Sequence, residues 1–163
     1  MKEFRWHTKM HLGLALCLIA IMLVTAAMPA LHVLADSAYH TEHIQLRAVG
    51  DAPLDYGFVN NIHPDGPEVY AHEIYELKGA LPHASYEVFL MVYVADTTCS
   101  SQVVRIPTAR LSTNEDGNGQ AQFFLPPAGV PSAWRASTHG IRWEIEHNGS
   151  VVYDTVCIAV ALD

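Results

Sequence analysis

The chain has 163 residues, of which half are hydrophobic and 16% are charged, and its formal net charge at neutral pH is −8. This length predicts a single domain. The excess of acidic residues, without a cluster of Lys or Arg to offset it, would repel a phosphate backbone, so the composition argues against nucleic acid as a partner.

The N-terminal segment has the pattern of a secretory signal peptide. A basic start over residues 2–9 leads into an apolar block over 12–28, and small residues end at Ala35. We therefore expect a signal-peptide helix over 1–35 and one domain over 36–163, secreted or attached to the cell surface. An uncleaved leader that anchors the chain in a membrane is the alternative. Without the leader, six basic and sixteen acidic residues remain, a net charge of −10.

The beginning of the mature chain predicts a strand followed by a long loop. Residues 43–49 alternate in hydrophobicity, with Leu46 and Ala48 on one face. Residues 51–67 are rich in Pro, Gly, Asn and Asp, which favours a loop interrupted by a short extended piece over 56–59.

The segment 68–78 is compatible with a strand or a short helix. Some apolar residues fall at helical spacing, but its β-branched and aromatic residues favour a strand. The segment contains His72-Glu73-x-x-Glu76, which resembles the zinc-protease helix motif His-Glu-x-x-His with Glu76 in place of the second His. On a strand His72 and Glu76 share a face and Glu73 points away, so we expect solvated side chains here.

Further strands follow. Residues 86–94 are apolar on both faces, which is typical of a central strand covered from two sides. Residues 102–113 form another extended run, in which Pro107 indicates an edge or a bulge. Residues 121–125 form the next strand, after a turn over 114–119.

The C-terminal part predicts a hairpin. In 141–147 Trp143 and its alternate neighbours face one way and charged residues face the other. Asn148-Gly149 is a strong two-residue turn signal, because both residues tolerate positive φ. We expect one partner strand over 150–162.

Two cysteines follow the leader, Cys99 and Cys157. An even number in an oxidising compartment predicts a disulfide, and closing the long loop between them would stabilise the fold by about 4 kcal/mol. Two reduced buried thiols are the alternative.

Seven or eight short strands separated by turns predict an all-β fold, an antiparallel β-sandwich. Residues 82–88, Pro-His-Ala-Ser-Tyr-Glu-Val, resemble the Pro-x-Thr-x-Tyr-x-Val signature of fibronectin type III domains. The resemblance implies an immunoglobulin- or fibronectin-III-like sandwich in which the hydroxyl of Tyr86 holds a corner between strands. The chain is also similar to uncharacterised secreted bacterial β-sandwich proteins, which implies a compartment but no activity.

Three features are candidate sites. His40-x-x-His43 is the tightest histidine pair, and imidazole suits zinc or copper. Trp134 lies in a loop and could stack on a sugar ring, although packing over one end of the sandwich is the simpler interpretation. Ligand-type residues over 114–119 resemble the start of a calcium loop, but Leu125 stands where a bidentate Glu is needed, so a plain hairpin turn is favoured.

No motif indicates catalysis or a cofactor. We expect a non-enzymatic module, secreted or on the cell surface, that has a binding or structural role and an unidentified macromolecular partner, protein or glycan. Contact with a membrane is expected only through an uncleaved N-terminal segment. The alternatives are an exported zinc- or copper-binding protein that uses its histidines, and a carbohydrate-binding module.

Overall fold

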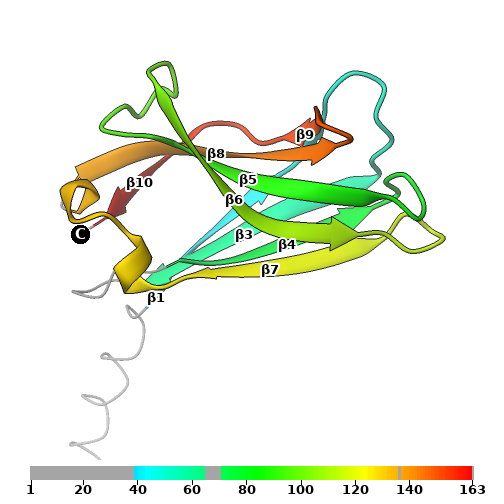
Figure 1. The fold of residues 1–163 in the computed structure, drawn as a ribbon, viewed down its shortest axis with the longest axis horizontal. Coiled ribbons are helices and arrows are strands. Elements are labelled where there is room, and N and C mark those ends of the chain that lie inside the picture. The colour runs from blue at the N-terminus through cyan, green and yellow to red at the C-terminus, as the bar shows by residue number, and fades with distance from the viewer. Residues whose placement is uncertain (1–38, 65–70, 136, 163) are drawn as a thin grey trace, which may run out of the picture. The chain divides into compact units, whose positions relative to one another are not determined.

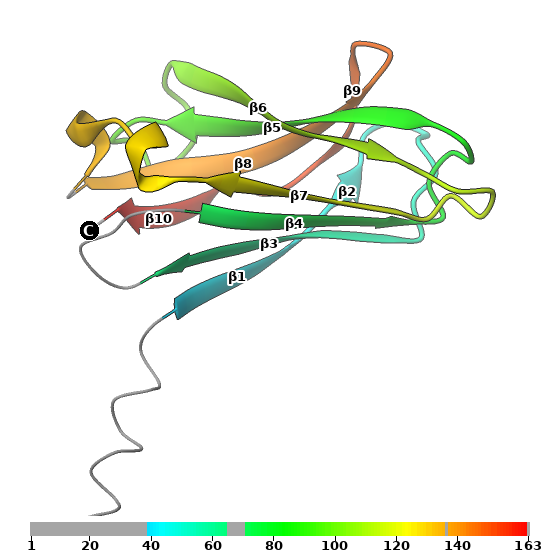
Figure 2. The same ribbon diagram turned by 60° about the horizontal axis from the view of Figure 1, so that its bottom comes forward.

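The computed structural model describes residues 39–64, 71–135 and 137–162. This part of the chain is all-β, and its strands form two antiparallel sheets that pack face to face (Figures 1 and 2). The predicted leader over 1–35 lies outside the described residues. Among those that are described, no helix is long and apolar enough to cross a membrane.

The first sheet has four strands, in the order β1 (Tyr39–Gln45), β3 (Tyr56–Pro64), β4 (Ala71–Lys78) and β7 (Gly119–Leu125). The prediction of a strand rather than a helix is confirmed over β4. The sheet also corrects the predicted loop over 51–67, because β3 continues five residues beyond the short strand expected there. Asparagine is ordinarily more common in turns than in strands, but Asn60 and Asn61 of β3 both lie in the ladders to β1 and β4.

The second sheet has six strands. They lie in the order β2 (Arg47–Ala48), β9 (Ser150–Asp154), β8 (Ser137–His147), β5 (Ser85–Tyr93) and β6 (Val103–Ser112), with β10 (Ile158–Leu162) also paired to β8. Two short 3-10 turns, η1 (Pro127–Gly129) and η2 (Ser132–Trp134), connect β7 to β8. These turns lie at the end of the sandwich where β7 and β10 finish (Figure 1).

Large apolar side chains fill the space between the sheets. Trp143, Tyr75, Tyr86 and Tyr153 are all fully buried there. Strand β5 is buried on both faces from Val88 to Tyr93, within the run predicted over 86–94, because its outer residues there form a second small cluster under the loop that follows it. That outer cluster consists of Phe89, Met91 and Tyr93.

Two local predictions are confirmed in detail. Strand β6 is an edge strand, and its register against β5 shifts between Val88 and Phe89, so that Thr108, directly after Pro107, is the extra residue of a bulge. At the other hairpin Asn148 and Gly149 both have positive φ, 51° and 76°, as a tight two-residue turn requires.

The first predicted strand is wrong in its second half. The chain leaves the four-stranded sheet after β1 and joins the other sheet as β2, with Leu46 buried at the crossing and Ala48 exposed. Alternation alone cannot show this change, because both segments are extended and a crossing needs only one residue outside the ladders.

The turn over 114–118 is also corrected. It is not a hairpin turn, because β6 and β7, which it connects, belong to different sheets. The Asn114 side-chain oxygen accepts the backbone N–H groups of Asp116 and Asn118, at 3.0 and 2.8 Å, so its hydrogen bonds are made within the turn.

The final predicted strand is split into β9 and β10. Between them, Thr155 Oγ1 accepts the backbone N–H of Trp143 at 3.0 Å, so a side chain replaces a ladder bond. Cys157 then forms a disulfide with Cys99, with an S–S length of 2.07 Å. The bridge passes beside Gly140 of β8 and links the loop after β5 to the break between β9 and β10. The predicted pairing is therefore present, and it is compatible with an extracellular location.

Candidate functional site

The outer surface of the four-stranded sheet carries aromatic side chains at positions that alternate with the buried core residues. The ring of Phe58 lies 5.6 Å from the ring of Tyr56 and 4.6 Å from that of His43. Phe124 is 54% exposed and Tyr56 is 39% exposed. We call this surface the aromatic face. It consists of His43, Tyr56, Phe58, Ile62, His72, Ile74 and Phe124, the amide side chains of Gln45, Asn60, Gln120 and Gln122, and the charged pair Glu76 and Lys78.

Hydrogen bonds hold part of the aromatic face in a defined arrangement. His43 Nδ1 lies 2.7 Å from Asn60 Oδ1, so this nitrogen carries the proton, and His43 Nε2 lies 3.2 Å from the hydroxyl of Tyr56. On the neighbouring strands His72 Nε2 lies 3.3 Å from Gln122 Oε1. The face therefore presents aromatic rings beside oriented amide groups.

The outer surface of the six-stranded sheet has a different chemistry. Its exposed side chains are mostly charged and form ion pairs, which is the usual composition of a solvated surface. The pairs are Arg110 with Glu87 at 2.9 Å, Arg105 with Glu146 at 2.5 Å, Arg47 with Asp154 at 3.0 Å, and Arg142 with Glu144. Among its described residues the aromatic face, by contrast, carries one acid, Glu76, which pairs with Lys78 at 2.8 Å.

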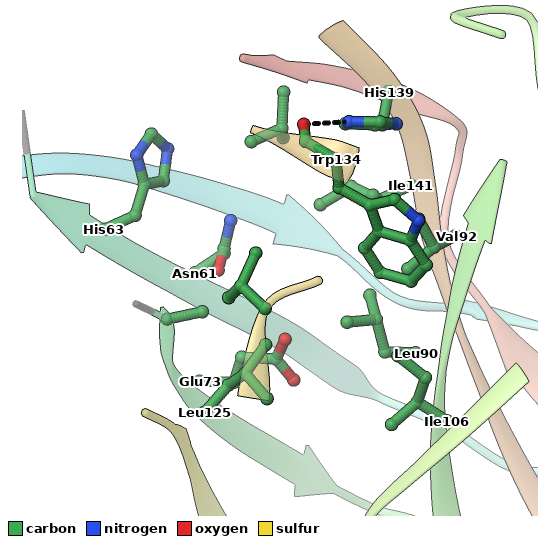
Figure 3. Close-up of a pocket in the computed structure, with 13 residues that line it drawn as sticks. Asn61, His63, Glu73, Leu90, Val92, Ile106, Leu125, Trp134, His139 and Ile141 are labelled. Atoms are coloured by element: carbon green, nitrogen blue, oxygen red, sulfur yellow. Dashed lines mark hydrogen bonds between the residues drawn. The ribbon is translucent and has the colours of Figure 1, made fainter. Parts of the chain in front are cut away.

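A cavity of about 60 Å³ lies between the two sheets, at the end that carries η1 and η2. Most of its wall is apolar, and four polar residues also line it. Figure 3 shows the side chains of Asn61 and Glu73 on one side of this space and Trp134 and His139 on the other. Because sites for small organic ligands usually measure about 300–1,000 Å³, this cavity can take only a small group.

Glu73 is the buried carboxyl of this region, with 1% of its surface exposed. Its Oε2 contacts the hydroxyl of Tyr75 and accepts the indole N–H of Trp143 at 3.0 Å. Tyr75 also lies 2.8 Å from Thr108 Oγ1, whose hydroxyl donates to the carbonyl of Val88 at 3.2 Å. The expectation that Glu73 is solvated is therefore wrong.

Burial raises the pKa of Glu73 from its ordinary value of 4.5 to about 7, although the hydrogen bonds from Tyr75 and Trp143 oppose this shift. Burial and the neighbouring carboxyl together raise the pKa of Tyr75 as well, so its hydroxyl stays protonated. When Glu73 is protonated, its O–H can donate to Tyr75, which in turn donates to Thr108. The network is therefore complete with a neutral carboxyl.

The structure places Trp134 and His139 together at the end of the sandwich. The backbone N–H of Ala95 donates to His139 Nδ1 at 3.1 Å, so the proton is on Nε2, which donates to the carbonyl of Trp134 at 2.7 Å. The indole of Trp134 lines the cavity and packs partly buried against the core, instead of projecting from a loop.

Of the remaining candidate residues, Tyr86 and His43 are not part of the cavity lining. Tyr86 Oη accepts the backbone N–H of Leu81 at 3.2 Å, at the crossing from β4 to β5. His40 lies in β1 opposite His63, and its side chain is outside the described set. His40 and His43 are three positions apart, and positions at odd spacing belong to opposite faces of a strand. Within the described residues no group of three or more His, Cys, Asp or Glu side chains could hold a metal ion.

Sequence reasoning missed both the aromatic face and the buried carboxyl, although a signal for each existed. Glu73 alternates with Tyr75 and Leu77, so the parity of the strand already assigned it to the core. Tyr56 and Phe58 hold alternate positions of the extended piece predicted over 56–59, and such positions share a face. The loop expected around this piece did not show that it continues as β3 between β1 and β4.

Comparison with known proteins finds no matching family model, no matching curated protein and no matching solved structure.

Proposed function

We propose that this protein is an exported, non-enzymatic β-sandwich module that binds a neutral glycan through its aromatic face. Export is supported by the signal-peptide pattern of the first 35 residues and by the disulfide between Cys99 and Cys157. The proposal extends to the immunoglobulin- or fibronectin-III-like type of sandwich. Its support is the chain's crossing between sheets after β4, β6 and β7, and the Tyr86 bond to backbone five residues upstream.

The observation that carries the binding proposal is the contrast between the two outer surfaces. Aromatic rings offer apolar area that can stack on the C–H face of a sugar ring, and amide side chains can donate to and accept from its hydroxyl groups. A surface of this composition suits a neutral, hydroxyl-rich ligand. The ion-paired surface of the other sheet offers few groups of this kind.

The size of the inter-sheet cavity supports binding on the surface. At about 60 Å³ the cavity cannot enclose a sugar ring, whereas the aromatic face spans four strands. A surface that spans four strands fits an extended chain of sugar units better than a single small molecule.

A glycan array with neutral oligosaccharides of glucose, mannose, xylose and N-acetylglucosamine tests the proposal. Tyr56→Ser and Phe124→Ser should each weaken binding by about tenfold or more, as loss of an aromatic contact does in other interfaces. Val104→Ser is the matched control, because Val104 is 41% exposed on the other sheet. Absence of binding to every neutral glycan, or equal binding by all three variants, would refute the proposal.

A further inference from the structure

The cavity between the sheets is lined by oxygen atoms that can accept further hydrogen bonds. Glu73 and Asn61 are direct cross-strand partners on β4 and β3, and both line the cavity. Glu73 uses Oε2 for Tyr75 and Trp143, whereas Oε1 takes no hydrogen bond from any described residue. The cavity therefore faces a carboxyl oxygen that still has room for a donor.

Asn61 contributes a second acceptor beside this oxygen. Its Nδ2 donates to Glu42 Oε2 at 2.8 Å, and because a carboxylate can only accept, the amide orientation is fixed by this bond. The amide oxygen then turns toward the side of the cavity that Glu73 occupies (Figure 3). Asn61 is 3% exposed, so both acceptors lie away from bulk water.

The other two polar residues of the wall are engaged elsewhere. His139 uses one ring nitrogen for Ala95 and the other for Trp134. His63 Nε2 lies 3.1 Å from Glu42 Oε1. Strands β5, β6, β7 and β10 contribute only aliphatic side chains to the wall. A group that fits here must therefore donate hydrogen bonds at one end and be apolar along its length.

The volume limits how large this group can be. At about 10–15 Å³ for each water-sized atom, about 60 Å³ holds about four to six non-hydrogen atoms. This corresponds to a nitrogen and about three to five carbon atoms.

We propose that this cavity binds a primary alkylammonium group, with its nitrogen at Glu73 Oε1 and Asn61 Oδ1 and its methylene groups along the aliphatic wall. An ammonium has three N–H donors and no acceptor, which matches two acceptor oxygens that take no hydrogen bond from a described residue. It also compensates the charge of a buried carboxylate, which is costly to leave unpaired. The group can belong to a small free amine or to a lysine side chain. This site is separate from the aromatic face and does not depend on glycan binding.

The proton and the ammonium compete for the same carboxyl. Because burial raises the pKa of Glu73 to about 7, an ammonium that binds the ionised form should bind about tenfold more tightly at pH 8 than at pH 6. Of the other titratable groups here, Tyr75 stays protonated, His139 is held by two hydrogen bonds and His63 is paired with Glu42.

The test is calorimetric titration of the purified full-length protein in an amine-free buffer at pH 8. The probes are n-propylammonium, n-propanol as its neutral analogue, and Nα-acetyl-lysine methylamide, which carries a lysine side chain without an α-amine. We expect saturable binding of n-propylammonium at least tenfold tighter than that of n-propanol. If the lysine derivative binds as tightly as n-propylammonium, the natural ligand is a lysine side chain, and if it does not, the ligand is a small free amine.

Glu73→Gln is the decisive variant, because the Gln oxygen can still accept from Tyr75 and Trp143 while its NH₂ group replaces the free acceptor. We expect it to lose the binding at least tenfold and to lose the pH dependence. Glu87→Gln, which removes an exposed carboxylate of the other sheet, should change neither. Equal binding of n-propanol, unchanged binding by Glu73→Gln, or no saturable binding of n-propylammonium would overturn the proposal and leave the cavity as a site for water. A native protein with no gain in affinity from pH 6 to pH 8 would overturn it too, even if Glu73→Gln failed to fold.

Discussion

The buried carboxyl of Glu73 makes a specific prediction about stability and pH. Its pKa is about 7 in the folded protein and 4.5 in an unfolded chain. Below pH 4.5 the carboxyl is protonated in both the folded and the unfolded state, so it does not lower the free energy of unfolding. Between pH 4.5 and 7 the unfolded chain ionises first, which stabilises the unfolded state and lowers the free energy of unfolding. Above pH 7 the carboxyl is ionised in both states, and the decrease in the free energy of unfolding stays constant.

The magnitude follows from the gap between the two pKa values. At about 1.4 kcal/mol for each pH unit, the gap corresponds to about 3 kcal/mol. Glu73→Gln removes this titration and keeps an oxygen that can accept from Tyr75 and Trp143. The free energy of unfolding of Glu73→Gln minus that of the native protein should therefore increase by about 3 kcal/mol from pH 4.5 to pH 7.5.

Urea denaturation at several pH values between 4.5 and 7.5 measures this difference. Amine-free buffers are needed, so that no ammonium ligand stabilises the native protein. Glu87→Gln serves as the control and should give a difference that hardly changes with pH, because Glu87 is half exposed and pairs with Arg110 at the surface. If the Glu73→Gln difference changes by less than about 1 kcal/mol across this range, the carboxyl is not the desolvated group that the structure describes.

Three further predictions concern β8 and the break between β9 and β10. Reduction of the disulfide, or Cys99→Ser with Cys157→Ser, should lower the free energy of unfolding by up to about 4 kcal/mol in urea, and a change below about 1 kcal/mol would contradict a structural bridge. Gly140→Ala should destabilise the fold by about 1–3 kcal/mol, because the new Cβ would lie 2.3 Å from the carbonyl oxygen of Asp96; an unchanged melting temperature would show that this contact is wrong. Thr155→Val should cost about 1–3 kcal/mol, because it leaves the backbone N–H of Trp143 buried without an acceptor, whereas Thr155→Ser should restore most of the loss.

Much of the fold could be predicted because local residue chemistry and the final packing agree. Pro107 cannot donate a ladder bond, so an edge or a bulge was required, and the structure has both. Asn148 and Gly149 tolerate positive φ, so their turn was determined locally. The two-sided apolar pattern of 86–94 could only belong to a covered central strand.

The errors occur where tertiary contacts decide. Nothing local shows that the chain changes sheet at Leu46, or that a turn over 114–118 joins two sheets instead of two paired strands. At the split between β9 and β10, the backbone N–H of Trp143 in β8 donates to the side chain of Thr155, and the local sequence around Thr155 does not show this contact. Charged residues are ordinarily exposed, and this expectation outweighed the alternation that placed Glu73 in the core.

The most direct test of the account is to map the glycan-binding surface by amide chemical shifts. The ¹⁵N-labelled protein is titrated with the neutral oligosaccharide that binds best on the array. We predict that the perturbed amides cluster on β1, β3, β4 and β7, around Tyr56, Phe58 and Phe124. Perturbations that cluster on the ion-paired surface of β5, β6 and β8 would contradict the assignment of the binding face, and a spectrum unchanged by every neutral glycan would contradict the proposed function.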